Sequence, residues 1–183
     1  PRFAAAFARM ILEMTPKPVK PDFESREFLS SHVEDILAFY EPVALDSDGG
    51  FFHFFLDDGT VYDRETRHLV SSTRFVFNYA SAFLWTGRGH YRDWAAHGLR
   101  YLATHHLTAK GHHLWQRKGD VIEDGRAMAY GHSFVMLAAA WAHRAGIEGA
   151  DRLIADTWDF MEAQFYEPGH SAYADERDAS LAT

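Results

Sequence analysis

The chain contains no cysteine, so it can form neither a disulfide framework nor a zinc site built on thiolates. Basic residues are scarce: 18 Lys and Arg stand against 26 Asp and Glu, which gives a formal net charge of −8. Nucleic acid and anionic membrane surfaces are therefore poor partners. The sequence also lacks an apolar run of the roughly 18 residues that a membrane-spanning helix needs. These absences favour a cytoplasmic protein that binds neither nucleic acid nor membrane.

Several common catalytic motifs are missing as well. The sequence has no phosphate-binding loop, no G-x-G-x-x-G motif and no G-x-S-x-G motif. It has 12 histidines, but the pairs at 105–106 and 112–113 are adjacent, so their side chains would not face one another on a helix. No H-E-x-x-H zinc motif is present. We therefore expect no metal site within the chain and no cofactor.

The sequence does contain a recurring pair, a glycine followed four residues later by an aromatic residue, with a period of about 60 residues. The three copies are Gly50 with Phe54, Gly111 with Trp115, and Gly169 with Tyr173. The first two copies continue alike, into a second glycine turn and an apolar pair. A fixed period of this length indicates a repeat architecture.

The stretches between these copies have the apolar spacing of helices. We expect hairpins at 51–62 and 111–123, and helices at 28–40, 71–85, 91–106, 126–144 and 149–165. Antiparallel helix pairs of this kind can close into an all-α toroid, an (α/α)6 barrel with short β-hairpins in the loops at one end. Six pairs of about 60 residues would need roughly twice this chain, so we expect it to cover about half of the ring.

The N-terminal stretch differs from the rest. Residues 1–21 end in a segment with prolines at 16, 18 and 21, which cannot be helical and is typical of a stiff linker. We therefore expect an N-terminal arm and linker at 1–21, followed by one domain at 22–183.

One helix face combines a cation with apolar residues. Val70, Arg74 and Asn78 follow one another at four-residue spacing and so share a face of the helix expected at 71–85. An arginine among aromatic residues is costly to bury without a partner. It is therefore either a functional cation or a member of an ion pair across the helix layer. Shifting by 60 residues gives the matching positions on the helix expected at 126–144, which are Tyr130, Phe134 and Ala138.

Acid–base groups are present near these positions. His68 precedes the first of the two helices and His132 lies on the second, and an unperturbed histidine titrates near pH 6.5. A single histidine on a helix is more often structural. Three acidic pairs, at 57–58, 123–124 and 175–176, fall in expected loops and are most simply explained as solvated turn residues.

The segment from His68 to Ala80, H-L-V-S-S-T-R-F-V-F-N-Y-A, resembles the N-acylglucosamine 2-epimerase superfamily, in its mannose isomerase and sulfoquinovose isomerase branch. The segment Tyr130-Gly131-His132-Ser133-Phe134 is similar to the Tyr-x-x-x-Phe helix of the same superfamily. The resemblance extends over about residues 23 to 183 and implies an (α/α)6 barrel, in agreement with the period.

The resemblance also implies chemistry at C2 of a sugar without a metal, through a cis-enediol. By this resemblance Arg74 stabilises the developing enediolate, and the residues that line the sugar pocket are Tyr130, Phe134, His132, Val70 and Asn78. Val70 departs from relatives that carry a pocket Trp at its position. The paired catalytic histidines of the family belong to later inner helices, so we expect the chain to be the N-terminal half of a longer enzyme and inactive alone.

The leading hypothesis is therefore an isomerase that interconverts an aldose and a ketose of the D-mannose/D-fructose type. A 2-epimerase of N-acylglucosamine or cellobiose is the nearest alternative. An inverting glycosidase on the same toroid would need two carboxylates about 6.5–9.5 Å apart. A non-catalytic relative that binds a protein partner is a further alternative, and the apolar inner faces of a half ring also favour a homodimer.

Overall fold

The computed structural model describes residues 20–41 and 43–181, so most of the predicted arm and linker lies outside the described residues. The chain divides into two compact units, the first ending at Phe39 and the second beginning at Tyr40. The first unit contains nearly all of α2 (Arg26–Tyr40). This helix begins after Ser25, whose Oγ accepts a hydrogen bond from the backbone N–H of Phe28 at 3.1 Å and so caps the helix.

The second unit contains the predicted helices and hairpins in the predicted order, together with further strands. They are β1 (Phe54–Phe55), β2 (Val61–Asp63), β3 (Thr66–His68), α3 (Leu69–Thr86), α4 (Gly89–Tyr101), η1 (Leu102–His106), β4 (Leu114–Lys118), β5 (Val121–Met128), α5 (Ala129–Arg144), α6 (Ala150–Gln164), β6 (Tyr166–Glu167), β7 (Ala172–Tyr173) and β8 (Glu176–Arg177). The predicted helices and the two predicted hairpins are all present.

Two helix boundaries differ from the prediction by more than two residues. The helix expected from residue 126 begins at 129, because residues 126–128 extend β5 and pair with β4 and β8. The helix expected at 91–106 is α-helical only to Tyr101 and ends in the π-helical turn η1. The predicted stop at Gly87 is confirmed, since this glycine adopts φ 72° and its N–H bonds to the carbonyl of Phe83.

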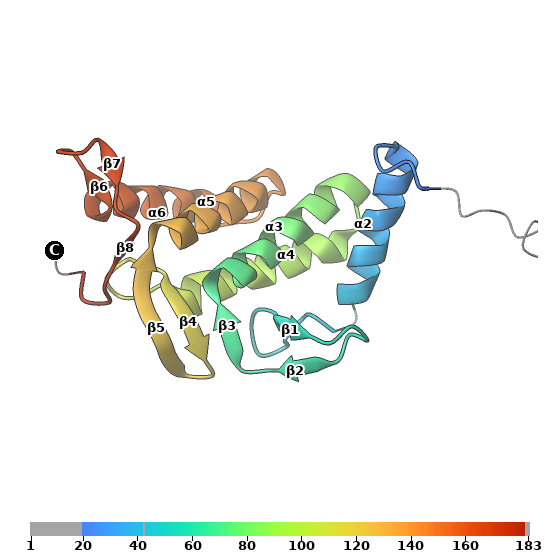
Figure 1. Cartoon of the computed structure of the whole chain (residues 1–183), viewed down its shortest axis with the longest axis horizontal. Helices are drawn as coiled ribbons and strands as arrows, with labels where there is room; N and C mark the ends of the chain where they lie inside the picture. Colours follow the sequence, from blue (N-terminus) through green and yellow to red (C-terminus); the bar gives the residue numbers. More distant parts are fainter. Residues whose placement is uncertain (1–19, 42, 182–183) are drawn as a thin grey trace, which may run out of the picture. The chain divides into compact units, whose positions relative to one another are not determined.

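The helices pack as two antiparallel pairs. Helix α3 packs against α4, α5 packs against α6, and α3 and α5 also pack against each other (Figure 1). Helices α3 and α5 are therefore the neighbouring members of the two pairs. Within the described ranges no helix is both long and apolar enough to cross a membrane.

The β-structure is larger than the loop hairpins that the sequence predicts. The prediction of the hairpin β4–β5 is confirmed, but β3 and β8 pair with its two edges. The result is an antiparallel sheet in the order β3-β4-β5-β8 (Figure 1). The pairs β1–β2 and β6–β7 form separate ladders. Because β3 runs directly into α3 and β5 into α5, the sheet lies at the N-terminal ends of these two helices.

An aromatic cluster forms the contact between α3 and the loop before β1. Phe51 stacks on Phe75 with ring centroids 4.9 Å apart and lies 5.3 Å from Tyr79. Helix α4 approaches this cluster through Gly98, where a Cβ atom would lie 2.5 Å from Phe51 Cε2 and 2.7 Å from Val76 Cγ2. Only a glycine leaves room for this close approach.

The close approach predicts a large effect of adding one methyl group. We expect Gly98→Ala to lower the free energy of unfolding by about 2–3 kcal/mol, because Phe51 and Val76 are fully buried and have no space to move into. Gly89→Ala is the matched control at the start of the same helix, where nothing lies within 4 Å of the added Cβ. It should leave stability unchanged or raise it by up to about 1 kcal/mol. Urea denaturation of both variants measures this, and equal midpoints would contradict the packing described.

Candidate functional site

Arg74 is an exposed cation on the face that α3 turns toward α5. Its Cζ lies 5.3 Å above the centre of the Phe134 ring, a cation–π contact. Among the described residues no carboxylate lies within ion-pair distance of it, so the ion pair across the helix layer, the alternative that the sequence left open, is not formed. In this part of the chain no acceptor competes for its N–H donors, which are therefore available to a ligand.

Two aromatic residues of α5 complete this cluster. The rings of Tyr130 and Phe134 lie 4.8 Å apart at an angle of 52°. Tyr130 is 54% exposed and Phe134 is half-buried, so both offer ring surface and Tyr130 also offers a hydroxyl. The structure thus brings together Arg74, Tyr130 and Phe134, three residues that the sequence analysis selected.

The other two predicted site residues on α3, Asn78 and Val70, differ in their exposure. Asn78 is exposed one turn after Arg74 and so belongs to the same accessible face. Val70 lies one turn before Arg74 and is only 5% exposed, so its side chain belongs to the core. It presents little surface for stacking against a ligand.

His132 is a structural residue in this arrangement, contrary to the prediction that it lines the pocket. Its ring is fully buried; Nδ1 donates to the carbonyl of Met128 at 2.8 Å and Nε2 accepts from the backbone N–H of His113 at 3.0 Å. The ring also stacks on Phe160 with centroids 5.1 Å apart. Burial lowers the pKa of His132 to about 4. With both nitrogens engaged, the side chain joins α5 to the start of β4 and has no free polar atom for a sugar.

His68 caps α3. Its Nδ1 accepts a hydrogen bond from the backbone N–H of Val70 at 3.2 Å, and its own backbone N–H donates to Nδ1 of His53 at 3.2 Å. The ring stands edge-on against Trp115, with centroids 4.4 Å apart. These contacts fix both the position and the orientation of the half-buried imidazole.

The electrostatic surroundings of His68 favour its neutral form. Burial lowers its pKa, the positive charge of Arg74 lowers it further, and Asp124 opposes both effects. The hydrogen bond from Val70 has the same consequence, because a protonated imidazole has no lone pair with which to accept it.

Trp115 links the N-terminal ends of α3 and α5, and the sequence analysis did not assign it to the site. A Cβ atom on Gly131 would lie 3.1 Å from Cζ3 of Trp115 and 2.7 Å from Cδ2 of Leu69. The indole therefore packs against both Gly131 and His68. The sequence signal was the glycine–aromatic repeat itself, which marked Trp115 as part of a hairpin without showing what it contacts.

A chain of polar contacts between largely buried side chains begins at His53, the residue that bonds to the backbone of His68. Nε2 of His53 lies 3.4 Å from the Ser72 hydroxyl, which lies 3.3 Å from Nε2 of His106. Nδ1 of His106 lies 3.1 Å from the carbonyl of Leu114. Because Nδ1 of His53 already accepts from His68, one direction of donation satisfies every group: His53 to Ser72, Ser72 to His106, and His106 to Leu114. Both histidines are neutral in this scheme.

The acidic residues near the sheet are held in polar contacts. Arg126 bonds to Asp124 at 2.7 Å and to Glu176 at 2.8 Å, and the hydrogen bond from Arg126 lowers the pKa of Asp124. Glu123 accepts from the side chain of Gln116 at 2.9 Å. Over 20–41 and 43–181, no group of three His, Cys, Asp or Glu side chains lies in a position to hold a metal ion.

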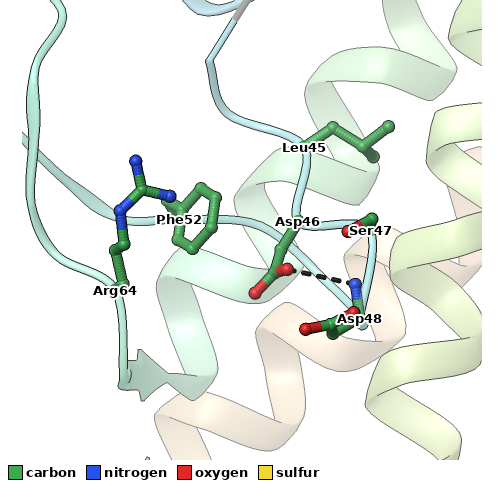
Figure 2. Close-up of a pocket in the computed structure, with 6 residues that line it drawn as sticks. All are labelled: Leu45, Asp46, Ser47, Asp48, Phe52 and Arg64. Carbon is green, nitrogen blue, oxygen red and sulfur yellow. Dashed lines mark hydrogen bonds between the residues drawn. The ribbon is translucent and has the colours of Figure 1, made fainter.

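A shallow hollow lies elsewhere in the second unit, on the loop before β1. Figure 2 shows the residues that line it, Leu45, Asp46, Ser47, Asp48, Phe52 and Arg64. Asp46 forms a 2.5 Å ion pair with Arg67 and also accepts from the N–H of Asp48 at 3.1 Å. The guanidinium groups of Arg64 and Arg67 each lie 4.9 Å from the Phe52 ring. These contacts hold the loop together, so we do not place the functional site there.

Comparison with known proteins gives an independent view. The sequence profile of the N-acylglucosamine 2-epimerase (GlcNAc 2-epimerase) family matches residues 50–183. A D-mannose isomerase of Marinomonas mediterranea is 45% identical over 163 residues, which are 89% of this chain and 41% of that protein. The crystal structure of a D-mannose isomerase superposes with a TM-score of 0.87 and 43% identity, covering 90% of this chain and 42% of the other.

A more distant structure shows the same fold. The cellobiose 2-epimerase of Spirochaeta thermophila superposes with a TM-score of 0.75 and 22% identity, covering 89% of this chain and 43% of the other. In each of these comparisons the chain spans less than half the length of the relative.

Proposed function

The chain belongs to the N-acylglucosamine 2-epimerase family, and we propose that it is the N-terminal part of a sugar isomerase that interconverts an aldose and a ketose of the D-mannose/D-fructose type. The observation that carries the proposal is the Arg74 guanidinium, which lies beside Phe134 and Tyr130 and has no carboxylate partner among the described residues. A cation with free donors next to exposed aromatic surface suits a sugar, whose hydroxyls need hydrogen bonds and whose C–H faces pack on rings. The 45% identity to a D-mannose isomerase supports the choice of substrate class.

We propose that the whole protein forms an (α/α)6 ring of which this chain supplies about half. The contact between α3 and α5, with α4 and α6 each packed on its partner, supports alternation of inner and outer helices. The share of 41–43% of each relative's length supports the proportion. The domain limits at 22 and 183, a cytoplasmic location and a homodimer stay predictions, and gel filtration tests the last of these.

The proposed reaction moves one proton from C2 to C1 and a second from O2 to O1, while the carbonyl double bond shifts from C1 to C2. A base removes the proton from C2 of the open-chain aldose, and the electrons form a cis-enediol as the C1 carbonyl oxygen gains negative charge. O1 then takes up a proton as O2 gives one up, a proton returns to C1, and the C2–O bond becomes the ketose carbonyl. Arg74 stabilises the enediolate oxygen, because a preorganised donor acts where charge develops. We assign proton transfer to none of the buried histidines, since burial lowers the pKa values of His106 and His132 to about 4.

Proton NMR in heavy water tests this reaction. We expect the intact protein with D-mannose and EDTA to form fructose that carries deuterium at C1, because the returning proton comes from a group that exchanges with solvent. A C2 epimer with deuterium at C2 would instead establish a 2-epimerase. Absence of exchange from mannose, N-acetylmannosamine and cellobiose would contradict enediol chemistry on these sugars.

A further inference from the structure

His68 has one ring nitrogen that no contact within the structure explains. Nδ1 accepts from Val70 at the start of α3, so in the neutral ring the proton is on Nε2. Within the described part of the chain Nε2 has no hydrogen-bond partner. It is not one of the buried unpartnered polar atoms, so it reaches solvent. The ring thus exposes an N–H donor whose direction is fixed.

The support around His68 is more extensive than a helix cap requires. Trp115 fixes the plane of the ring, and His53 holds the backbone at the same residue. His53 continues through Ser72 to His106 and β4, the strand that carries Trp115. Serine, threonine, asparagine and aspartate cap helices well without such a framework. The framework instead suits a donor that must keep one position.

The location of His68 connects this donor to the Arg74 cluster. His68 precedes α3, which carries Arg74, and Trp115 bridges from His68 to Gly131, next to Tyr130 on α5. The two side chains also interact electrostatically, because the positive charge of Arg74 lowers the pKa of the His68 imidazole. A sugar that contacts Arg74 and Tyr130 would lie over the N-terminal ends of both helices.

We propose that His68 is a substrate-binding residue, which as a neutral imidazole donates the Nε2 hydrogen to an oxygen of the sugar. The proposal rests on the proposed function, and it assigns His68 a hydrogen bond and no proton transfer. A neutral imidazole at a helix N-terminus polarises a carbonyl or hydroxyl oxygen without exchanging its proton. The capping bond from Val70 explains why the ring stays neutral, since protonation would break it.

The test compares His68→Asn with His68→Ala in the intact protein. Asparagine is among the best N-cap residues, so His68→Asn should keep the melting temperature. Its shorter side chain ends before the position of Nε2, so the variant has no donor at that position. His68→Ala loses both the helix cap and the donor, and its melting temperature should be about 2–4 °C lower. We expect His68→Asn to lower kcat/KM for mannose about 10- to 100-fold, and to weaken binding of mannitol, which cannot form an enediol, about 2- to 10-fold.

Several outcomes would overturn the assignment. His68→Asn with wild-type kcat/KM would show that His68 is a cap only, while the isomerase proposal stands. Loss of an inflection from the pH profile of kcat/KM in this variant would show that His68 transfers protons. A wild-type protein that isomerises no sugar contradicts the proposed function itself, and in that case mannitol binding, measured by calorimetry on both variants, still tests the donor.

Discussion

Replacing Arg74 by alanine in the intact protein is expected, under the proposed function, to lower kcat for sugar isomerisation by about 10²- to 10³-fold or more, with a smaller change in KM. The guanidinium has no carboxylate partner among the described residues and keeps its donors for a ligand. Removing one preorganised donor at a developing oxyanion has an effect of this size in other enzymes. The fold should tolerate the change, because the side chain is exposed and contacts Phe134 only through a cation–π interaction.

Two further variants separate the charge from the shape of the side chain. Arg74→Lys keeps a positive charge but not the planar fork that stacks on Phe134, so it should recover only part of the rate. Arg152→Ala is the matched control, since Arg152 is an exposed arginine of α6 whose side chain is 85% accessible. It should retain full activity. Steady-state kinetics with circular dichroism measures all three, and a normal kcat for Arg74→Ala would contradict the proposed role.

The second large effect is a loss of folding stability at acidic pH. His106 and His132 are fully buried with pKa values of about 4, whereas an unfolded histidine titrates near 6.5. Below pH 6.5 the unfolded chain therefore binds more protons than the folded chain, and stability falls as pH falls toward 4. Each histidine contributes about 2 kcal/mol to this loss by pH 5, out of a total stability of about 5–15 kcal/mol. His113, whose pKa burial lowers well below its usual value, adds to it.

Thermal unfolding at pH 7 and pH 5 measures this loss, and we expect the melting temperature to fall by on the order of 10 °C. Histidine ring NMR on the folded protein gives a direct check, because His106 and His132 should remain neutral at pH 5. His143→Gln, at an exposed position on α5, is the control and should leave the pH dependence unchanged. Equal stability at the two pH values, or ring signals that titrate near pH 6.5, would contradict the prediction.

Local signals in the sequence predict most of the fold. The apolar spacing of α3, α4, α5 and α6 and the glycine at the end of α3 act within a few residues, so the helices could be placed from sequence. The four-stranded sheet could not, because the pairing of β5 with β8 joins residues about 50 positions apart and depends on the helices in between. The π-helical turn η1 was also missed, since its sequence is equally compatible with a regular helix.

The candidate site could likewise be predicted only in part from the sequence. Helical spacing and the 60-residue period placed Arg74, Tyr130 and Phe134 on matching faces, and the structure brings them together. His132 was selected from its place between Tyr130 and Phe134 and from the family resemblance, and neither shows which way a side chain turns. His132 points into the core because Met128 and His113 provide partners there. The bond to Met128 is local, but the bond from His113 forms only when the start of β4 lies against α5.

The sheet at the ends of the helices has a consequence for how the molecule unfolds. In linear repeat proteins each repeat contacts only its neighbours, so one repeat can melt while the others stay folded. Here β3 precedes the first helix pair, β4 and β5 lie between the pairs, and β8 follows the second pair, yet all four belong to one hydrogen-bonded ladder. Opening either pair therefore disturbs strands of the other. The ladder therefore joins the two helix pairs into one cooperative unit. We expect amide hydrogens in its strands to exchange only when this whole unit opens.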